Sequence, residues 1–89
     1  MPQAIGDPEE LRNFANLLAQ YLETLETKTN NLQNGFSNLS ETWQDEKRAA
    51  FEEQFGALMA QIAQFKAASE EQVPYLLALA EKLQNYLNS

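Results

Sequence analysis

The sequence predicts an all-α protein: an antiparallel two-helix hairpin that dimerises into a four-helix bundle. Two apolar patterns with the α-helical period run along the chain, one before and one after a break at residues 38–46. The break is rich in serine, threonine and aspartate, whose side-chain oxygens end helices and cap new ones. Because the chain has only 89 residues, we expect one domain over residues 1–89, with a helix at 8–40, a turn at 41–45 and a helix at 46–87.

The first helix has a strong start signal. Asp7 is placed to cap it, Pro8 suits its first position, and the carboxylates of Glu9 and Glu10 match the positive end of the helix dipole. An apolar stripe with spacings of three and four residues follows this signal, and Ala15 and Leu22 widen one flank of it. The stripe consists of Leu11, Phe14, Leu18, Tyr21, Leu25, Thr29, Leu32, Phe36, Leu39 and Trp43.

The polar segment at residues 27–35 is the weakest part of the first helix. Its side chains have poor helix propensity, and the Asn34-Gly35 pair is also typical of a turn. The apolar stripe keeps one phase on both sides of this segment, whereas a turn would normally reset the phase. We therefore expect a single helix through residues 27–35.

The second helix begins with a cap at either Asp45 or Thr42. Its stripe consists of Phe51, Phe55, Leu58, Ile62, Phe65, Ser69, Val73, Leu76, Ala80, Leu83 and Leu87. Pro74 interrupts the helix, because proline has no N–H and crowds the preceding turn, so we expect either a kinked continuous helix or a short third helix. A turn centred near residues 42–43 would set Pro74 beside Leu11 and leave the residues after about 78 overhanging.

The two stripes supply the candidate hairpin or dimer interface. Each stripe covers roughly 120° of its helix, more than a two-helix seam requires, and the surplus predicts a homodimer or pairing with a related hairpin protein. The chain also has no cysteine for a stapling disulfide, so association is the available support. The interface residues are Leu11, Phe14, Leu18, Tyr21, Leu25, Leu32, Phe36, Leu39, Phe51, Phe55, Leu58, Ile62, Phe65, Leu76 and Leu83.

Composition argues against several classes of function. The chain has neither cysteine nor histidine and no Gly-rich phosphate loop, so we expect no catalytic residue, no metal site and no cofactor. A net charge of −7 disfavours nucleic acid and anionic lipid as partners. No apolar run approaches the roughly 20 residues of a membrane-spanning helix, so we expect no membrane insertion. The N-terminal segment also lacks the pattern of a signal peptide.

Trp43 is the only tryptophan of the chain and lies within the predicted turn. Its indole suits an aromatic cap over the end of the hairpin, which is the more common role of such a residue. An alternative is a partly exposed ring that binds a partner, because tryptophan is enriched at binding hot spots.

The segments Asp7-Pro8-Glu9-Glu10-Leu11, Leu39-Ser40-Glu41-Thr42-Trp43-Gln44-Asp45 and Ala50-Phe51 give the chain a family resemblance. Together they resemble the WXG superfamily of small type VII, early-secreted-antigen-like secretion substrates, whose turn carries Trp-x-Gly. The resemblance implies a bacterial hairpin that pairs into a four-helix bundle and is exported by a membrane-anchored ATPase system. It makes Trp43, Gln44 and Asp45 the turn motif.

Two features depart from that family pattern. Asp45 replaces the glycine of Trp-x-Gly, and aspartate tolerates turn conformations better than most residues. The tail signal Tyr-x-x-x-Asp/Glu is missing, because Tyr75 is followed at the fourth place by Leu79 and only three residues follow Tyr86. A signal on a partner chain would still permit export.

The sequence therefore indicates a non-enzymatic interaction protein of the type VII kind. We expect it to be cytoplasmic, or secreted without a cleavable signal peptide, with a secretion ATPase among its candidate partners. The alternative is an intracellular helical adaptor that lends its apolar stripe to a different protein and has no link to secretion.

Overall fold

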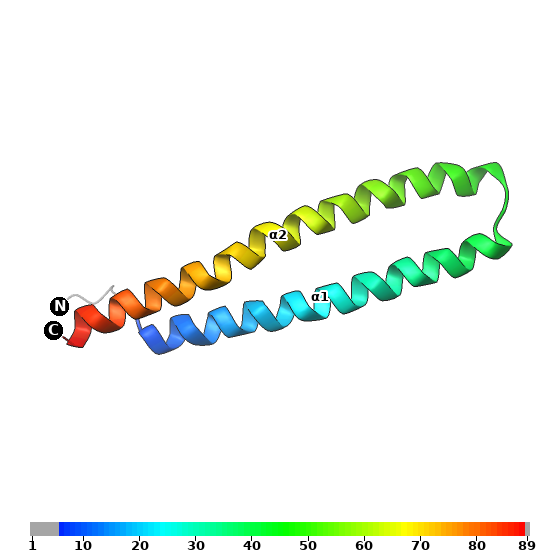
Figure 1. Cartoon of the computed structure of the whole chain (residues 1–89). Helices are drawn as coiled ribbons and strands as arrows, with labels where there is room; N and C mark the ends of the chain where they lie inside the picture. The colour runs from blue at the N-terminus through cyan, green and yellow to red at the C-terminus, as the bar shows by residue number, and fades with distance from the viewer. Residues whose placement is uncertain (1–5, 89) are drawn as a thin grey trace.

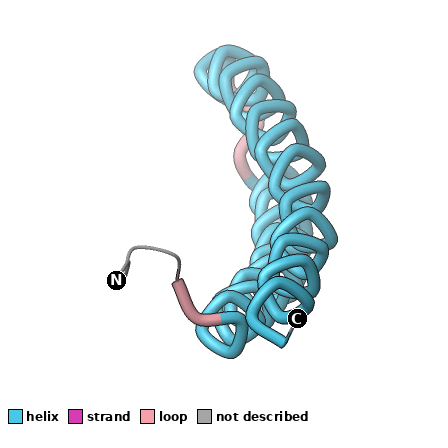
Figure 2. Tube along the Cα trace, turned by 90° about the vertical axis from the view of Figure 1, so that its left-hand side faces the viewer, coloured by secondary structure: helices cyan, strands magenta, loops and turns pink. Residues whose placement is uncertain are grey.

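The computed structural model describes residues 6–88, which form two long antiparallel helices and no strand. Helix α1 spans Pro8–Thr42 and helix α2 spans Glu46–Asn88 (Figure 1). The molecule is a rod with principal extents of 67 × 17 × 17 Å, and a view along it shows that the rod is bowed (Figure 2). Neither α1 nor α2 contains an apolar stretch of the length that a membrane-spanning helix requires.

The start of α1 uses the residues that the sequence predicts. The side chain of Asp7 accepts a hydrogen bond from the backbone N–H of Glu9 at 2.9 Å, and Pro8 occupies the first turn, where no N–H is needed. The helix continues without a break through residues 27–35, as the constant phase of the stripe predicts. It ends at Thr42, two residues beyond the predicted end, and the N–H of Trp43 closes its last turn on the carbonyl of Leu39 at 2.9 Å.

Asp45, and not Thr42, caps α2. Its Oδ1 accepts hydrogen bonds from the backbone N–H groups of Lys47 at 2.9 Å and Arg48 at 3.2 Å. The hydroxyl of Thr42 instead donates to the carbonyl of Leu39 at 3.3 Å, within the last turn of α1. Helix α2 then runs through Pro74 to Asn88 as one curved helix, so no third helix forms (Figure 1).

The pairing of the two helices differs from the predicted register. Leu11 shares a surface hollow with Leu79 and Leu83, whereas Pro74 lies beside Ala19 and Leu22. The predicted contact of Pro74 with Leu11 is therefore wrong, because the turn between Thr42 and Glu46 centres on Gln44 and not on residues 42–43. Residues 79–83 still face α1, because Ala80 is fully buried and Leu79 and Leu83 share the hollow with Leu11. The end of α2 projects past the start of α1 only beyond these residues, later than the predicted position of about 78 (Figure 1).

The most deeply buried residues of the rod lie near its terminal end, away from the turn. Ala15 and Ala80 are fully buried and Leu22 is nearly so. Alanine allows two helix backbones to approach closely, and Figure 1 shows the helices close together at this end and further apart toward the turn. Residues 23–79 contain no fully buried side chain, so the half of the rod nearer the turn is covered less completely by its own chain.

Candidate interaction surface

The turn brings Trp43 and Asp45 into direct contact. The indole Nε1–H of Trp43 donates a hydrogen bond to Asp45 Oδ1 at 2.9 Å, and this is the same oxygen that caps α2. Gln44 lies between them, and its side-chain amide donates to the carbonyl of Glu41 at 3.1 Å. The three residues of the predicted turn motif therefore tie the end of α1 to the start of α2.

Asp45 does not need the conformational freedom of the glycine that it replaces. Within residues 6–88, no residue other than glycine has a positive φ angle, so the backbone at Asp45 lies in a region open to any L-residue. The turn therefore does not depend on an unusual tolerance of aspartate for turn conformations, as the sequence had suggested. The contribution of Asp45 is the carboxylate that binds Trp43 and caps α2.

Trp43 is half-buried and combines features of both predicted roles. Its ring lies against Phe51, with centroids 6.0 Å apart, so it covers the end of the aromatic row on α2. The rest of the indole remains open to solvent at the tip of the rod. The structure therefore favours neither a fully buried cap nor a freely exposed ring.

An aromatic cluster continues from Trp43 along the gap between the helices. The ring centroid of Phe36 lies 4.8 Å from that of Phe55 and 5.7 Å from that of Phe51. These rings, with Leu32 and Leu39, line an open apolar groove of about 310 Å³. Asn31 and Gly35 complete its wall on α1.

The predicted interface residues divide into two groups. Eight are half-buried along the inner seam of the hairpin, and seven remain 45–57% exposed. The half-buried group consists of Leu11, Leu18, Leu25, Phe36, Phe55, Ile62, Leu76 and Leu83. The exposed group, which we call the apolar face, consists of Phe14, Tyr21, Leu32, Leu39, Phe51, Leu58 and Phe65.

Contacts across the two helices show that members of this group lie on one side of the rod. Tyr21 of α1 meets Phe65 of α2 with ring centroids 6.4 Å apart, and Leu39 and Phe51 line the same groove. Leu58 lies seven residues, about two turns, from both Phe51 and Phe65, so it falls in the same row of α2. These members of the apolar face therefore extend from the groove beside the turn along α2 to the Tyr21–Phe65 pair.

Sequence reasoning missed which residues form the tightest part of the seam. Ala15 and Leu22 appeared only as a widening of the stripe, yet they are buried while Phe14 and Tyr21 are exposed. Periodicity alone does not distinguish the row that faces the partner helix from the adjacent row. Small size was the available signal for Ala15, because closely packed helices favour alanine at the contact.

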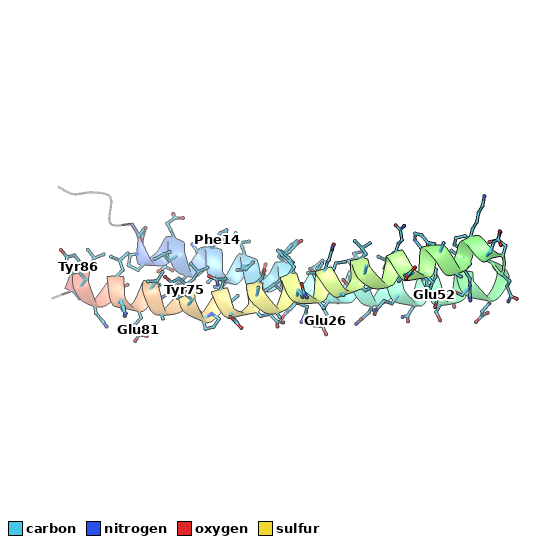
Figure 3. All side chains as sticks on the ribbon, turned by 90° about the horizontal axis from the view of Figure 1, so that it is seen from above. Phe14, Glu26, Glu52, Tyr75, Glu81 and Tyr86 are labelled. Atoms are coloured by element: carbon cyan, nitrogen blue, oxygen red, sulfur yellow. The ribbon has the colours of Figure 1, made fainter. Side chains whose placement is uncertain are left out.

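Lys66 lies away from the apolar face and pairs with a carboxylate on each helix. Its Nζ lies 2.6 Å from Glu70 on its own helix and 3.6 Å from Glu26 on α1, so it joins the two helices by an ion pair. The hydrogen bond to Glu70 and the charge of Glu26 raise the pKa of Lys66 above its ordinary value. Figure 3 shows Phe14 and Glu81 projecting from opposite sides of the hairpin.

The carboxylates of the described residues do not gather into a metal site. Residues 6–88 contain no cluster of three or more histidine, cysteine, aspartate or glutamate side chains suited to hold a metal ion. The hollow beside Pro74 is lined by three carboxylates, Glu23, Glu26 and Glu70, and two of these pair with Lys66, Glu70 at 2.6 Å and Glu26 at 3.6 Å.

Comparisons with known proteins place this architecture in a family. The family WXG100, described as proteins of 100 residues with WXG, matches residues 5–86, which is nearly the whole chain. The comparisons with curated proteins and with solved structures gave no match. The matched range includes both helices and the Trp43-Gln44-Asp45 turn. The chain is a helical hairpin that belongs to the WXG100 family.

Proposed function

We propose that this protein acts through protein–protein contacts, without catalysis, as a secreted or secretion-associated hairpin dimer of a type VII system. Membership of the WXG100 family supports the assignment to type VII secretion, because proteins of this family are small non-enzymatic secretion substrates. They also typically pair with another hairpin. The single observation that carries the proposal for this chain is its half-exposed apolar face.

The apolar face is larger than a stable monomer normally leaves in water. Its seven large side chains are 45–57% exposed, and contiguous apolar patches of this kind usually mark an interface. Covering the exposed half of one such side chain contributes about 1 kcal/mol. Covering the apolar faces of two chains together contributes on the order of 10 kcal/mol, which is comparable with the free-energy cost of association. A second hairpin laid against this face would complete a four-helix bundle.

The distribution of charge is compatible with a second copy of this chain as the partner. Each copy has a net charge of −7, so two copies repel unless their carboxylates stay apart. Glu26 and Glu70 surround Lys66 on the side away from the apolar face. Two copies can therefore join their apolar faces while these carboxylates point outward, and a related hairpin with a similar face is the alternative partner.

Export is the second part of the proposal, with a secretion ATPase as a partner. We infer that the paired hairpin is recognised as a unit or that a partner chain supplies an export signal. The competing hypothesis is an intracellular adaptor that uses the same apolar face. The two hypotheses predict different locations for the protein.

The test is to measure the protein in culture supernatant and in cells, with the type VII ATPase gene intact and deleted. A cytoplasmic protein of similar size serves as the control for lysis. We expect the protein in the supernatant only when the ATPase is present. Protein confined to the cells in both strains would contradict export and support the adaptor.

A further inference from the structure

We propose that Asp45 is a positioning residue for Trp43. Asp45 holds the indole in one orientation at the tip of the rod. Because Asp45 already binds the indole N–H, a protein partner would contact the ring of Trp43 and not its N–H. The part that concerns a partner rests on the proposed function, whereas the positioning itself does not. Glycine at this place of the motif has no side chain that would do the same.

A single carboxylate oxygen of Asp45 makes every contact that the inference requires. Oδ1 accepts from Trp43 Nε1 at 2.9 Å, from Lys47 N at 2.9 Å and from Arg48 N at 3.2 Å. Hydrogen bonds to an ionised acceptor are shorter and stronger than neutral ones. The orientation of the indole is therefore coupled to the first turn of α2.

Phe51 restrains the indole from a second direction. Its ring centroid lies 6.0 Å from that of Trp43, with the ring planes 39° apart. Phe51 in turn contacts Phe36 at 5.7 Å and Phe55 at 6.0 Å, so the indole joins the aromatic cluster of the groove. With one edge bound to Asp45 and the ring beside Phe51, rotation about the side-chain bonds of Trp43 is restricted.

This arrangement limits how a partner can recognise the tip. The indole is a donor only, and its one N–H is already used within the chain. A partner that offers a hydrogen-bond acceptor gains nothing from it unless the bond to Asp45 breaks. The matching surface is instead an apolar or aromatic pocket that accepts the exposed part of the ring.

Two substitutions in the full chain separate positioning from helix capping. Asp45→Asn keeps an oxygen acceptor at the same distance from the backbone. Asp45→Ser keeps a helix-capping oxygen but places it one bond nearer the backbone, so we expect it to cap α2 without reaching the indole. Because Trp43 is the only tryptophan, the exchange of the indole proton with water and the fluorescence anisotropy both report on this residue alone.

We expect Asp45→Ser to speed indole-proton exchange about tenfold and to lower the anisotropy. Asp45→Asn keeps the acceptor but loses its charge, so it should change both quantities less than Asp45→Ser does. Unchanged exchange in the serine variant would contradict the inference. The inference would also be contradicted if the amides of Lys47 and Arg48 lost as much protection from exchange as the indole does. Asp45 would then act only through the start of α2.

Measuring export of the serine variant tests the part that concerns a partner. If the fixed ring is what a partner binds, export falls while the dimer mass is unchanged. Normal export of the serine variant would contradict that part. If the wild type is not exported, the proposed function fails, while the exchange and anisotropy results still decide the positioning of Trp43.

Discussion

Tyr21 and Phe65 meet edge to face across the two helices, with ring centroids 6.4 Å apart, yet 52% of Tyr21 and 50% of Phe65 remain exposed. An edge-to-face pair stabilises the fold by about 0.5–1.5 kcal/mol beyond the burial of its apolar area. A second molecule that covered the outer surface of the pair would bury further apolar area. The pair joins the two helices, but it leaves half of each side chain for another molecule to cover.

Leu58→Lys and Leu77→Lys form a matched pair that tests the apolar face. Leu58 is 48% exposed on this face, and Leu77 is 40% exposed in the helix row of Glu70 and Glu81. A lysine at position 58 places two charges in the symmetric interface, so we expect association to weaken by on the order of 3 kcal/mol, more than a hundredfold. Leu77→Lys should leave association unchanged. Sedimentation velocity over a dilution series measures both, and equal effects would show that this face is not the interface.

Gly35→Ala and Gly56→Ala test whether the groove is covered. Both glycines lie inside helices, and a Cβ built on either would meet no atom within 4 Å. Alanine should therefore stabilise either helix by about 0.5–1 kcal/mol. Only Gly35 lines the groove beside Phe36, so a second hairpin packed there would meet the added methyl group. In urea unfolding we expect Gly56→Ala to raise the free energy of unfolding by this full amount. Gly35→Ala should raise it less or lower it. Equal gains would indicate an open groove.

Trp43→Ala should lower the free energy of unfolding by about 2 kcal/mol. This is less than the 3–5 kcal/mol typical of a fully buried tryptophan, because the ring is half-buried and keeps only Phe51 as an aromatic neighbour. Urea unfolding followed by circular dichroism gives the value. No loss of stability together with a loss of partner binding would assign Trp43 to binding alone.

Lys66 should make the stability of the hairpin fall at alkaline pH. Its pKa is raised in the folded chain by Glu70 and Glu26, so its contribution is fully present below the unfolded-state pKa. The contribution is lost as the pH rises through the folded-state pKa. Other lysines and the tyrosines titrate in the same range, so Lys66→Met is the control. The difference in Tm between wild type and variant should shrink above about pH 10.4, and a constant difference would show that the ion pairs do not contribute.

The hairpin itself was predictable because several local signals agree. The cap at Asp7, the single phase through residues 27–35 and the polar break before Asp45 all indicate two long helices, and the structure has them. Pro74 also proved compatible with a continuous helix.

The register and the inner seam were harder to predict. Each helix carries two adjacent apolar rows, and periodicity gives no reason to choose Ala15 and Leu22 over Phe14 and Tyr21 for the contact with α2. The choice follows from backbone approach, which small side chains permit at the terminal end. The bond between Trp43 and Asp45 was equally hidden, because a turn places side chains in ways that spacing does not encode.

The mass of the protein in solution tests the central claim, that the apolar face joins two copies, most directly. Light scattering behind a sizing column at micromolar concentration should give twice the 10.1 kDa of one chain, and Leu58→Lys should return the mass to that of one chain. A wild-type mass of one chain at every micromolar concentration would contradict the account.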